Sequence, residues 1–202
     1  LVLFAADKLD VVNIALGRIR LLAGAEAKAI PDNVFAFTWV TDFPLFERSA
    51  EGGLTSVNHP FTAPHPEDVD LIERDPLKAR ALAYDVILNG VELGGGSIRI
   101  HDSDLQARAF RALGLSDEKI KTMFGHMIDA FKYGAPPHGG LALGLDRVVM
   151  LMVGADSLRD VIAFPKTQKA VELMINAPDR VDARQLREIW IQLDLPEPEA
   201  KA

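Results

Sequence analysis

Cysteine is absent from this 202-residue sequence, so disulfide frameworks, thiolate zinc sites and cysteine nucleophiles are excluded. No apolar run approaches the roughly 20 residues that cross a bilayer, which predicts a soluble protein that does not use a membrane. Basic residues are also in deficit, because 22 Lys and Arg stand against 29 Asp and Glu, a net charge of −7. That balance argues against a general nucleic-acid coat but allows a local basic patch.

The chain has the composition of a globular protein, with 49% hydrophobic and 25% charged residues. Its length suits one domain, or one domain and part of another. The first residue is Leu1 rather than Met, and residues 1–6 lack the features of a signal peptide, which predicts a piece of a longer polypeptide. A change of pattern near Pro31 predicts a domain boundary, and residues 196–202 are typical of a disordered tail.

The hydrophobic periodicity predicts an α+β fold with a mainly antiparallel sheet flanked by helices. Pro76 is expected to break a helical stretch over 67–83, and Ser103 with Gln106 to form a capping box. The predicted helices span 9–22 (ending at Gly24), 103–113, 116–133, 146–152 and 186–193. The predicted strands span 34–40, 84–88, 91–93, 98–100, 141–145 and 161–164, and 51–66 is a loop.

Asn89-Gly90 between two apolar runs is the strongest hairpin signal in the sequence. A two-residue turn there places Ile87 opposite Glu92, with Asp85 on the same face two residues away. Two carboxylates on one face, together with phosphate oxygens and water, are how proteins usually hold Mg²⁺. From spacing alone, a pair of solvent-facing carboxylates at a sheet edge is the better explanation of the pattern.

Three consecutive glycines, 94–96, predict a bulge or a ligand that lies against the backbone. In a regular strand Arg99 lies on the face opposite Glu92, whereas a bulge within 94–96 brings it beside the carboxylates. There its planar guanidinium could clamp a carboxylate or phosphate. The alternative is a surface arginine that pairs with Asp102 or Asp104.

Two further segments carry polar side chains that could bind ligands. In 139–147 an apolar strand runs through Gly144 into a helix whose first turn holds Asp146 and Arg147, which can reach phosphate, although the segment is not a P-loop. Asn58, His59 and His65 lie in the polar loop, where they either contact a polar ligand or are merely solvated. No histidines have the helical spacing of a zinc site, and His126 is expected to be structural.

Three segments together resemble one enzyme family, the bacterial-type aspartyl-tRNA synthetases of class II. These segments are Asn-His-Pro-Phe-Thr at 58–62, the stretch 84–101 around the hairpin and the glycines, and Gly-Leu-Ala-Leu-Gly-Leu-Asp-Arg at 140–147. The last is similar to the third signature motif of class II and marks only the class, whereas the other two narrow the resemblance to the aspartate enzyme. The resemblance covers about 34–193.

The resemblance implies a partial class II catalytic core, with residues 1–30 as the end of an inserted domain and 31–195 as the C-terminal part of the catalytic domain. It implies activation of L-aspartate by ATP with Mg²⁺, transfer to the acceptor end of tRNA, a cytoplasmic location and a homodimeric full-length enzyme. Its implied catalytic residues are Arg99, Glu92 and Arg147. The implied aspartate ligands are Asn58, His59 and Arg99, the ATP ligands are Glu92, Gly144, Leu145, Asp146 and Arg147, and the metal ligands are Asp85 and Glu92.

The sequence departs from the family pattern in two respects. Many members have a His-His pair where this chain has Asn58 and His59, and an amide binds by hydrogen bonds without charge. The anticodon-binding barrel and the first two class II motifs are not found, so the chain corresponds to roughly the second half of the active site. Two other functions stay open: a tRNA-independent aspartate amide ligase of the same fold, and a non-catalytic nucleotide-binding or regulatory module.

Overall fold

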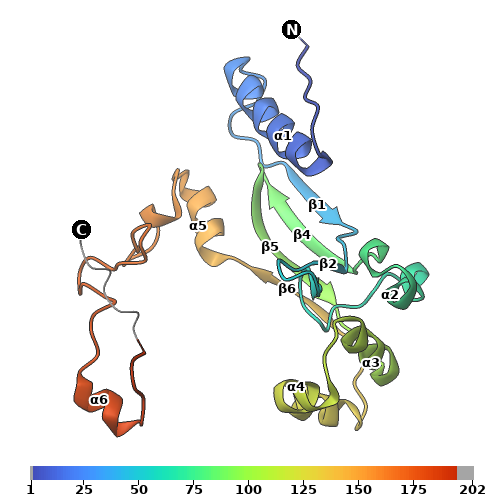
Figure 1. The fold of residues 1–202 in the computed structure, drawn as a ribbon. Helices are drawn as coiled ribbons and strands as arrows, with labels where there is room; N and C mark the ends of the chain where they lie inside the picture. The colour runs from blue at the N-terminus through green and yellow to red at the C-terminus, as the bar shows by residue number, and fades with distance from the viewer. Residues whose placement is uncertain (1, 195–202) are drawn as a thin grey trace, which may run out of the picture. The chain divides into compact units, whose positions relative to one another are not determined.

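The computed structural model describes residues 2–194, which form two compact units that divide between Ala142 and Leu143 (Figure 1). The predicted tail, 196–202, lies outside the described residues. None of the helices within 2–194 has the length and hydropathy of a membrane span.

The first unit is built on a four-stranded sheet with helices beside it, which confirms the predicted α+β class. The strand order is β1-β4-β5-β6, and β1 with β4 and β4 with β5 pair antiparallel; a small second sheet joins β2 to β3. Its elements are α1 (Leu9–Glu26), β1 (Phe37–Thr41), β2 (Phe46–Arg48), β3 (Leu54–Ser56), η1 (Pro66–Asp68), α2 (Leu71–Arg74), η2 (Pro76–Lys78), β4 (Ala83–Leu88), β5 (Val91–Ile98), α3 (Ser103–Ala112), α4 (Asp117–Phe131) and most of β6 (Gly139–Leu143).

The last strand, β6, lies antiparallel to β5. The Arg99 N–H donates to the His138 carbonyl at 2.9 Å, while a Cβ on Gly139 would lie 2.9 Å from the Ser97 carbonyl. Residue numbers therefore rise along one strand as they fall along the other, as antiparallel pairing requires.

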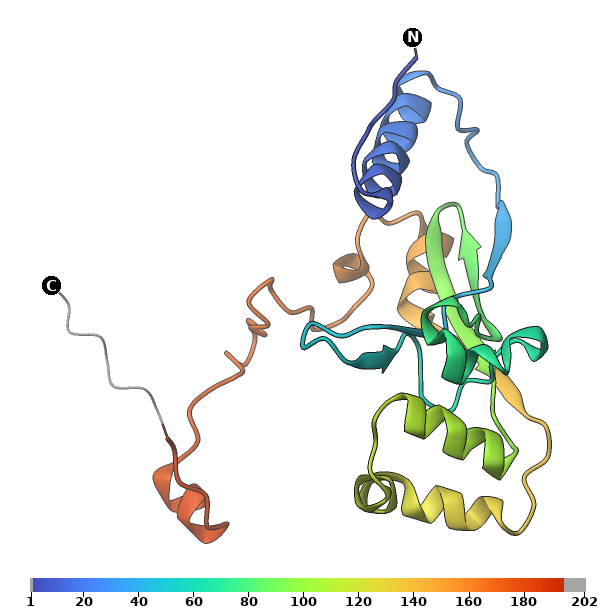
Figure 2. The same ribbon diagram turned by 45° about the vertical axis from the view of Figure 1, so that its right-hand side comes forward.

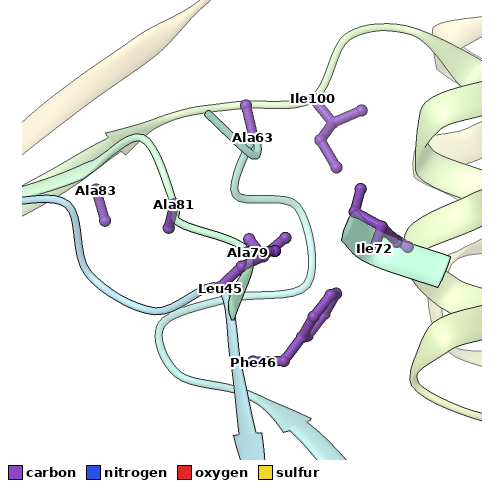
Figure 3. Packing of buried hydrophobic residues seen from close by; sticks show 9 residues of the cluster. Leu45, Phe46, Ala63, Ile72, Ala79, Ala81, Ala83 and Ile100 are labelled. Carbon is purple, nitrogen blue, oxygen red and sulfur yellow. The ribbon is translucent and has the colours of Figure 1, made fainter. Parts of the chain in front are cut away.

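The hydrophobic core lies where the segment before β2 and the segment before β4 meet helices α2 and α3 (Figure 3). Small side chains dominate the stretch 79–83, which lets the chain segments approach closely, and Ile72 and Ile100 are each 1% exposed. The buried members are Leu45, Phe46, Ala63, Ile72, Ala79, Ala81, Ala83, Ile100 and Ala109.

Local capping explains the helices near the core. The predicted capping box at Ser103 is wrong by one residue, because the Asp102 carboxylate accepts the Leu105 N–H at 2.7 Å and makes Asp102 the N-cap of α3. The predicted Ser116 cap is confirmed, since its hydroxyl accepts the Lys119 N–H of α4. Gly114 adopts a left-handed φ of 69° after α3, as a glycine that ends a helix should.

Several predicted boundaries are corrected by the structure. Helix α1 continues through Gly24 to Glu26, because one interior glycine weakens a helix without ending it. The predicted strand at 161–164 does not form, and its residues instead make turns and bends after a short 3-10 helix. The predicted loop 51–66 contains strand β3, and the final helix α6 is shorter than 186–193 and starts earlier.

The second unit contains α5 (Leu145–Val153), η3 (Leu158–Asp160) and α6 (Ala183–Glu188). The predicted helix over 146–152 is confirmed as α5, and none of its residues is buried. Within the described part of this unit, Glu172 is the one buried residue, so the unit has no hydrophobic core of its own. An apolar helix stays exposed when nothing in its own unit covers it.

Candidate functional site

The hairpin that joins β4 to β5 forms as its turn residues predict. Asn89 and Gly90 both have positive φ, 50° and 83°, as the favoured two-residue hairpin turns require. Ile87 pairs with Glu92, which confirms the predicted register. The Asn89 side chain also fixes the segment before β1, because its amide donates to the Val34 carbonyl and its oxygen accepts the Ala36 N–H.

A bulge interrupts the pairing of β4 with β5, one residue before the glycines in which it was predicted. Ile87 pairs with Glu92 but Val86 pairs with Gly94, so Leu93 is the extra residue. The bulge reverses the alternation of β5 and brings the residues at 95, 97 and 99 onto the face of Glu92. Arg99 therefore follows on the carboxylate face, as predicted for a bulged strand.

Two glycines of the run make room for the side chains of β4. A Cβ on Gly95 would collide with the Asp85 carboxylate, and a Cβ on Gly96 would lie 3.1 Å from the Tyr84 ring and collide with the Gly140 carbonyl. On that second face the Tyr84 hydroxyl crosses β5 and donates to the Gly140 carbonyl at 2.9 Å. The glycines thus let one carboxylate lie flat on the sheet and let one tyrosine tie β4 to β6.

The Asp85 carboxylate is close enough to Glu92 to be affected by its charge. Partial burial raises the pKa of Asp85, and the negative charge of Glu92 raises it further. A cation beside Asp85 would therefore stabilise its charged form. A divalent ion held by two carboxylates and completed by phosphate oxygens and water fits this pair, because Mg²⁺ is seldom enclosed by protein ligands alone.

The loop 58–62 lies against the strand segment that carries Arg99. Thr62 and Arg99 form an antiparallel bridge, flanked by the Ile100 N–H donating to the Phe61 carbonyl at 2.8 Å. Arg99 makes no ion pair with Asp102 or Asp104 within the described residues, and Asp102 instead caps α3. The structure thus brings Arg99 to the histidine loop rather than to the alternative acidic partners.

His59 is oriented by a hydrogen bond to its ring. Partial burial and the positive charge of Arg99 lower its pKa, which favours the neutral imidazole. Its Nδ1 accepts the Phe61 N–H at 3.2 Å, which assigns the ring proton to Nε2. The ring therefore offers an N–H donor beside a guanidinium, and carboxylates bind to that kind of donor pair.

An aromatic cluster packs against the loop 58–62. The Phe61 ring packs edge-on against Phe110 of α3 and Phe124 of α4, with ring centroids 5.7 and 5.2 Å apart. Phe131 joins them at 6.3 Å, and α3 and α4 lie side by side in Figures 1 and 2. Helical periodicity identified the stripes of α3 and α4, but no local signal indicates that Phe61 packs against both of them.

A second ionic cluster, absent from the sequence-based predictions, lies a short way upstream of β4. Arg80 donates to buried Asp68 through Nε at 2.7 Å, Nη2 at 3.1 Å and its backbone N–H at 2.9 Å. These bonds lower the pKa of Asp68 to about 2. Glu67 accepts from the same guanidinium at 3.0 Å, and His65 lies 3.4 Å from it, so His65 belongs to this cluster rather than to a ligand site.

Residues 144–147 belong to the second unit. Gly144 precedes α5 as its N-cap residue, Asp146 lies in the first turn, and Arg147 is half-buried. A helix N-terminus favours anions through its free N–H groups and dipole, which suits a predicted phosphate contact.

The remaining histidines have no shared site. His101 and His126 are exposed, and His138 contacts the Pro136 carbonyl at 2.8 Å. No group of three or more His, Asp or Glu side chains within 2–194 is arranged so that it could hold a metal ion. The acidic pair on β4 and β5 is accordingly a half-site that a ligand's own oxygens would complete.

Known proteins resemble this chain in sequence along almost its whole length. The family model described as tRNA synthetases class II (D, K and N) matches residues 19–168. The "Aspartate--tRNA ligase" of Macrococcus caseolyticus is 55% identical over 196 residues, which are 96% of this chain and 33% of that protein. The "Aspartate--tRNA(Asp/Asn) ligase" of Thermoanaerobacter sp. (strain X514) is 53% identical with the same coverage. The chain thus spans about a third of the length of the curated relatives it matches.

Solved structures resemble the fold. The aspartyl-tRNA synthetase of Entamoeba histolytica superposes with a TM-score of 0.51 at 24% identity, over 85% of this chain and 29% of that one. The asparaginyl-tRNA synthetase of the same organism, in complex with asparaginyl-adenylate, gives 0.50 at 25% identity, over 68% of this chain and 26% of that one.

Proposed function

Since the chain belongs to the class II tRNA synthetases of the aspartate, lysine and asparagine group, we propose that it supplies part of the active site of an aspartate–tRNA ligase. The reaction is attack of the aspartate α-carboxylate on the α-phosphorus of ATP, which releases pyrophosphate, followed by transfer of the aspartyl group to the 3′ end of tRNA. The relatives that carry the name of this activity are about three times as long as the chain.

One observation carries the proposal. The bulge at Leu93 gathers Asp85, Glu92 and Arg99 onto a single face of the sheet, although the sequence separates them by up to fourteen positions. Two carboxylates on the same face as a guanidinium suit a substrate pair made of a metal-bound nucleotide and an acidic amino acid.

Aspartate recognition falls to Arg99 with His59 and Asn58. The Arg99 fork accepts the side-chain carboxylate through two parallel hydrogen bonds, and the Nε2–H of neutral His59 adds a third donor. Asn58 is exposed in the same loop and can hydrogen-bond the amino acid without charge. A carboxylate satisfies these donors better than the amide of asparagine does, because an amide would turn its own N–H₂ toward a cation.

ATP binding is assigned to Glu92 and residues 144–147. Mg²⁺ held by Asp85 and Glu92 would neutralise phosphate charge when bound. Gly144 and Leu145 at the start of α5 suit a nucleotide lying against backbone, Asp146 lies in the first turn, and Arg147 is assigned to the terminal phosphate. Catalysis of this kind relies on positioning and charge neutralisation rather than on a covalent protein intermediate. A homodimeric full-length enzyme and a cytoplasmic location are part of the same proposal.

The test is aspartate-dependent exchange of pyrophosphate into ATP. The chain is assayed alone and in a chimera where it replaces the matching third of the Macrococcus caseolyticus ligase, with asparagine and lysine as control substrates. We expect the chimera to exchange pyrophosphate with aspartate only, and then to charge tRNA.

An inactive chimera beside an active parent ligase would overturn the proposal. Exchange without subsequent tRNA charging, accompanied by an amide product, would favour a tRNA-independent ligase of the same fold.

A further inference from the structure

Gln106 is a buried polar side chain that the proposed reaction does not use directly. It lies on α3, is 3% exposed, and its Nε2 donates to the Pro60 carbonyl at 2.9 Å. Pro60 follows His59 in the loop that is proposed to read aspartate. A helix that belongs to the core thus reaches into the substrate loop through one hydrogen bond between residues 46 positions apart.

The hydrogen bond from Gln106 to Pro60 lies next to the two hydrogen bonds that orient His59. Two bonds fix that histidine: the Phe61 N–H donates to its Nδ1 at 3.2 Å, and the Thr62 N–H donates to its carbonyl at 2.9 Å. The two donors belong to the two residues that follow Pro60 in the sequence. A shift of the Pro60 peptide would move these donors relative to the ring, so the anchor at Gln106 controls the direction of the His59 Nε2–H.

Gln106 is also poorly suited to a purely structural role. Its other amide atom, Oε1, is buried and has no hydrogen-bond partner among the residues that the structure describes, and an unpaired buried acceptor destabilises the fold. An apolar side chain of the same length, such as Met, would remove that orphan and pack against the same neighbours. The hydrogen bond to the Pro60 carbonyl is therefore the interaction that distinguishes an amide from Met at this position.

We propose that Gln106 is a positioning residue that holds the Asn58–His59 pair in its aspartate-binding orientation through the Pro60 carbonyl. This inference rests on the proposed function, because it concerns how that site recognises aspartate. The Gln106 side chain itself touches no substrate, and its effect passes through the loop.

The chain offers a matched control on the same helix. Arg108 is half-buried, with a side chain that is 25% exposed, and it donates to Glu73 at 3.1 Å and to the Val69 carbonyl at 3.1 Å. These contacts connect α3 to α2 and to the segment just before it. Its bonds lead away from the substrate loop. Arg108→Met therefore removes a structural bond from α3, whereas Gln106→Met removes the anchor of the loop.

The experiment compares the two variants in the chimera by pyrophosphate exchange and thermal unfolding. Gln106→Met should raise the KM for aspartate about three- to tenfold, which corresponds to the loss of one hydrogen bond. The KM for ATP should stay unchanged. The midpoint of thermal unfolding should stay unchanged or rise. Arg108→Met should lower the midpoint of unfolding and leave the KM for aspartate unchanged. A lowered midpoint with unchanged KM for Gln106→Met would overturn the proposal.

Amide hydrogen exchange on the 202-residue chain separates this inference from the proposed function. Gln106→Met should speed exchange of the Phe61 and Thr62 amides, which bond to His59, and leave the amides of α3 as they are. Unchanged exchange at 61 and 62 would overturn the positioning role even if the enzyme is active. Faster exchange in a protein without aspartate activity would refute the proposed function but not the anchor.

Discussion

Two carboxylates of the first unit, Asp68 and Asp85, lie in opposite electrostatic situations. Asp68 is satisfied by the Arg80 guanidinium and backbone, and its pKa falls to about 2. Asp85 is half-buried beside Glu92, and its pKa rises. A carboxylate that is paired with an arginine of the same chain stabilises the fold. A carboxylate that lies beside another negative charge is better explained by the binding of a cationic ligand.

The largest contrast should come from removing each charge separately. Asp85→Asn should reduce pyrophosphate exchange roughly 100-fold or more, the usual effect of deleting one preorganised charge, without lowering the midpoint of thermal unfolding. Asp68→Asn should do the reverse, because Arg80 then lacks its partner: unfolding occurs several degrees lower while activity per folded molecule persists. Both are measured in the chimera by exchange and calorimetry. Equal losses of stability in the two variants would contradict the comparison.

The two arginines extend the comparison. Arg99→Lys should raise the KM for aspartate about 10- to 100-fold, because a point charge cannot replace two parallel charged hydrogen bonds. Arg80→Lys removes a similar fork from Asp68 and should change unfolding but not the KM for aspartate. Steady-state exchange kinetics check both, and an unchanged KM in Arg99→Lys would remove Arg99 from the aspartate site.

A smaller effect is expected at the second member of the acidic pair. Glu92→Gln should raise the KM for ATP about tenfold at limiting Mg²⁺, equivalent to one charged interaction of about 1.5 kcal/mol, and less at saturating Mg²⁺. It should also bring the pKa of Asp85 down, since the opposing charge is gone. A defect that does not respond to Mg²⁺ would argue against the metal role.

The smallest effect is in the pH dependence of stability, where the two carboxylates have opposite signs. The stabilisation by Asp68 is present above its ordinary pKa of 3.8 and is lost as the pH falls toward about 2. Asp85 has a raised pKa, so its contribution is most favourable below 3.8 and declines as the pH rises through its folded-state value. Unfolding free energies of Asp68→Asn and Asp85→Asn across pH 2–6 should therefore diverge from the parent in opposite directions.

The hairpin that carries Asp85 and Glu92 could be predicted from local sequence signals. Asn89-Gly90 fixes the hairpin, and the hairpin fixes which carboxylates share a face; the glycine run then indicated a bulge, although the extra residue is Leu93. The roles of Asn58, His59 and residues 144–147 stay predictions, because they concern ligands rather than the fold.

The Asp68–Arg80 ion pair and the contact of Gln106 with Pro60 could not be predicted from the sequence. Asp68 and Arg80 are twelve residues apart, with Asp68 at the end of η1 and Arg80 in the segment between η2 and β4, so no helical or strand periodicity relates them. Gln106 looked like part of a capping box, and only the tertiary fold directs it to Pro60 instead. The predicted strand at 161–164 failed for a similar reason: a short apolar run forms a strand only where a neighbouring strand is available.

The central claim is that the Asp85–Glu92 pair exists to hold a cation with ATP, whereas Asp68 is already neutralised by the protein. The most direct measurement is an NMR titration of the side-chain carboxyl carbons of Asp85 and Asp68, with and without Mg²⁺ and ATP. We predict that Asp85 titrates above its ordinary range alone and well below it with both ligands, while Asp68 titrates near 2 in either case. An Asp85 pKa that does not respond to Mg²⁺ and ATP would contradict the account.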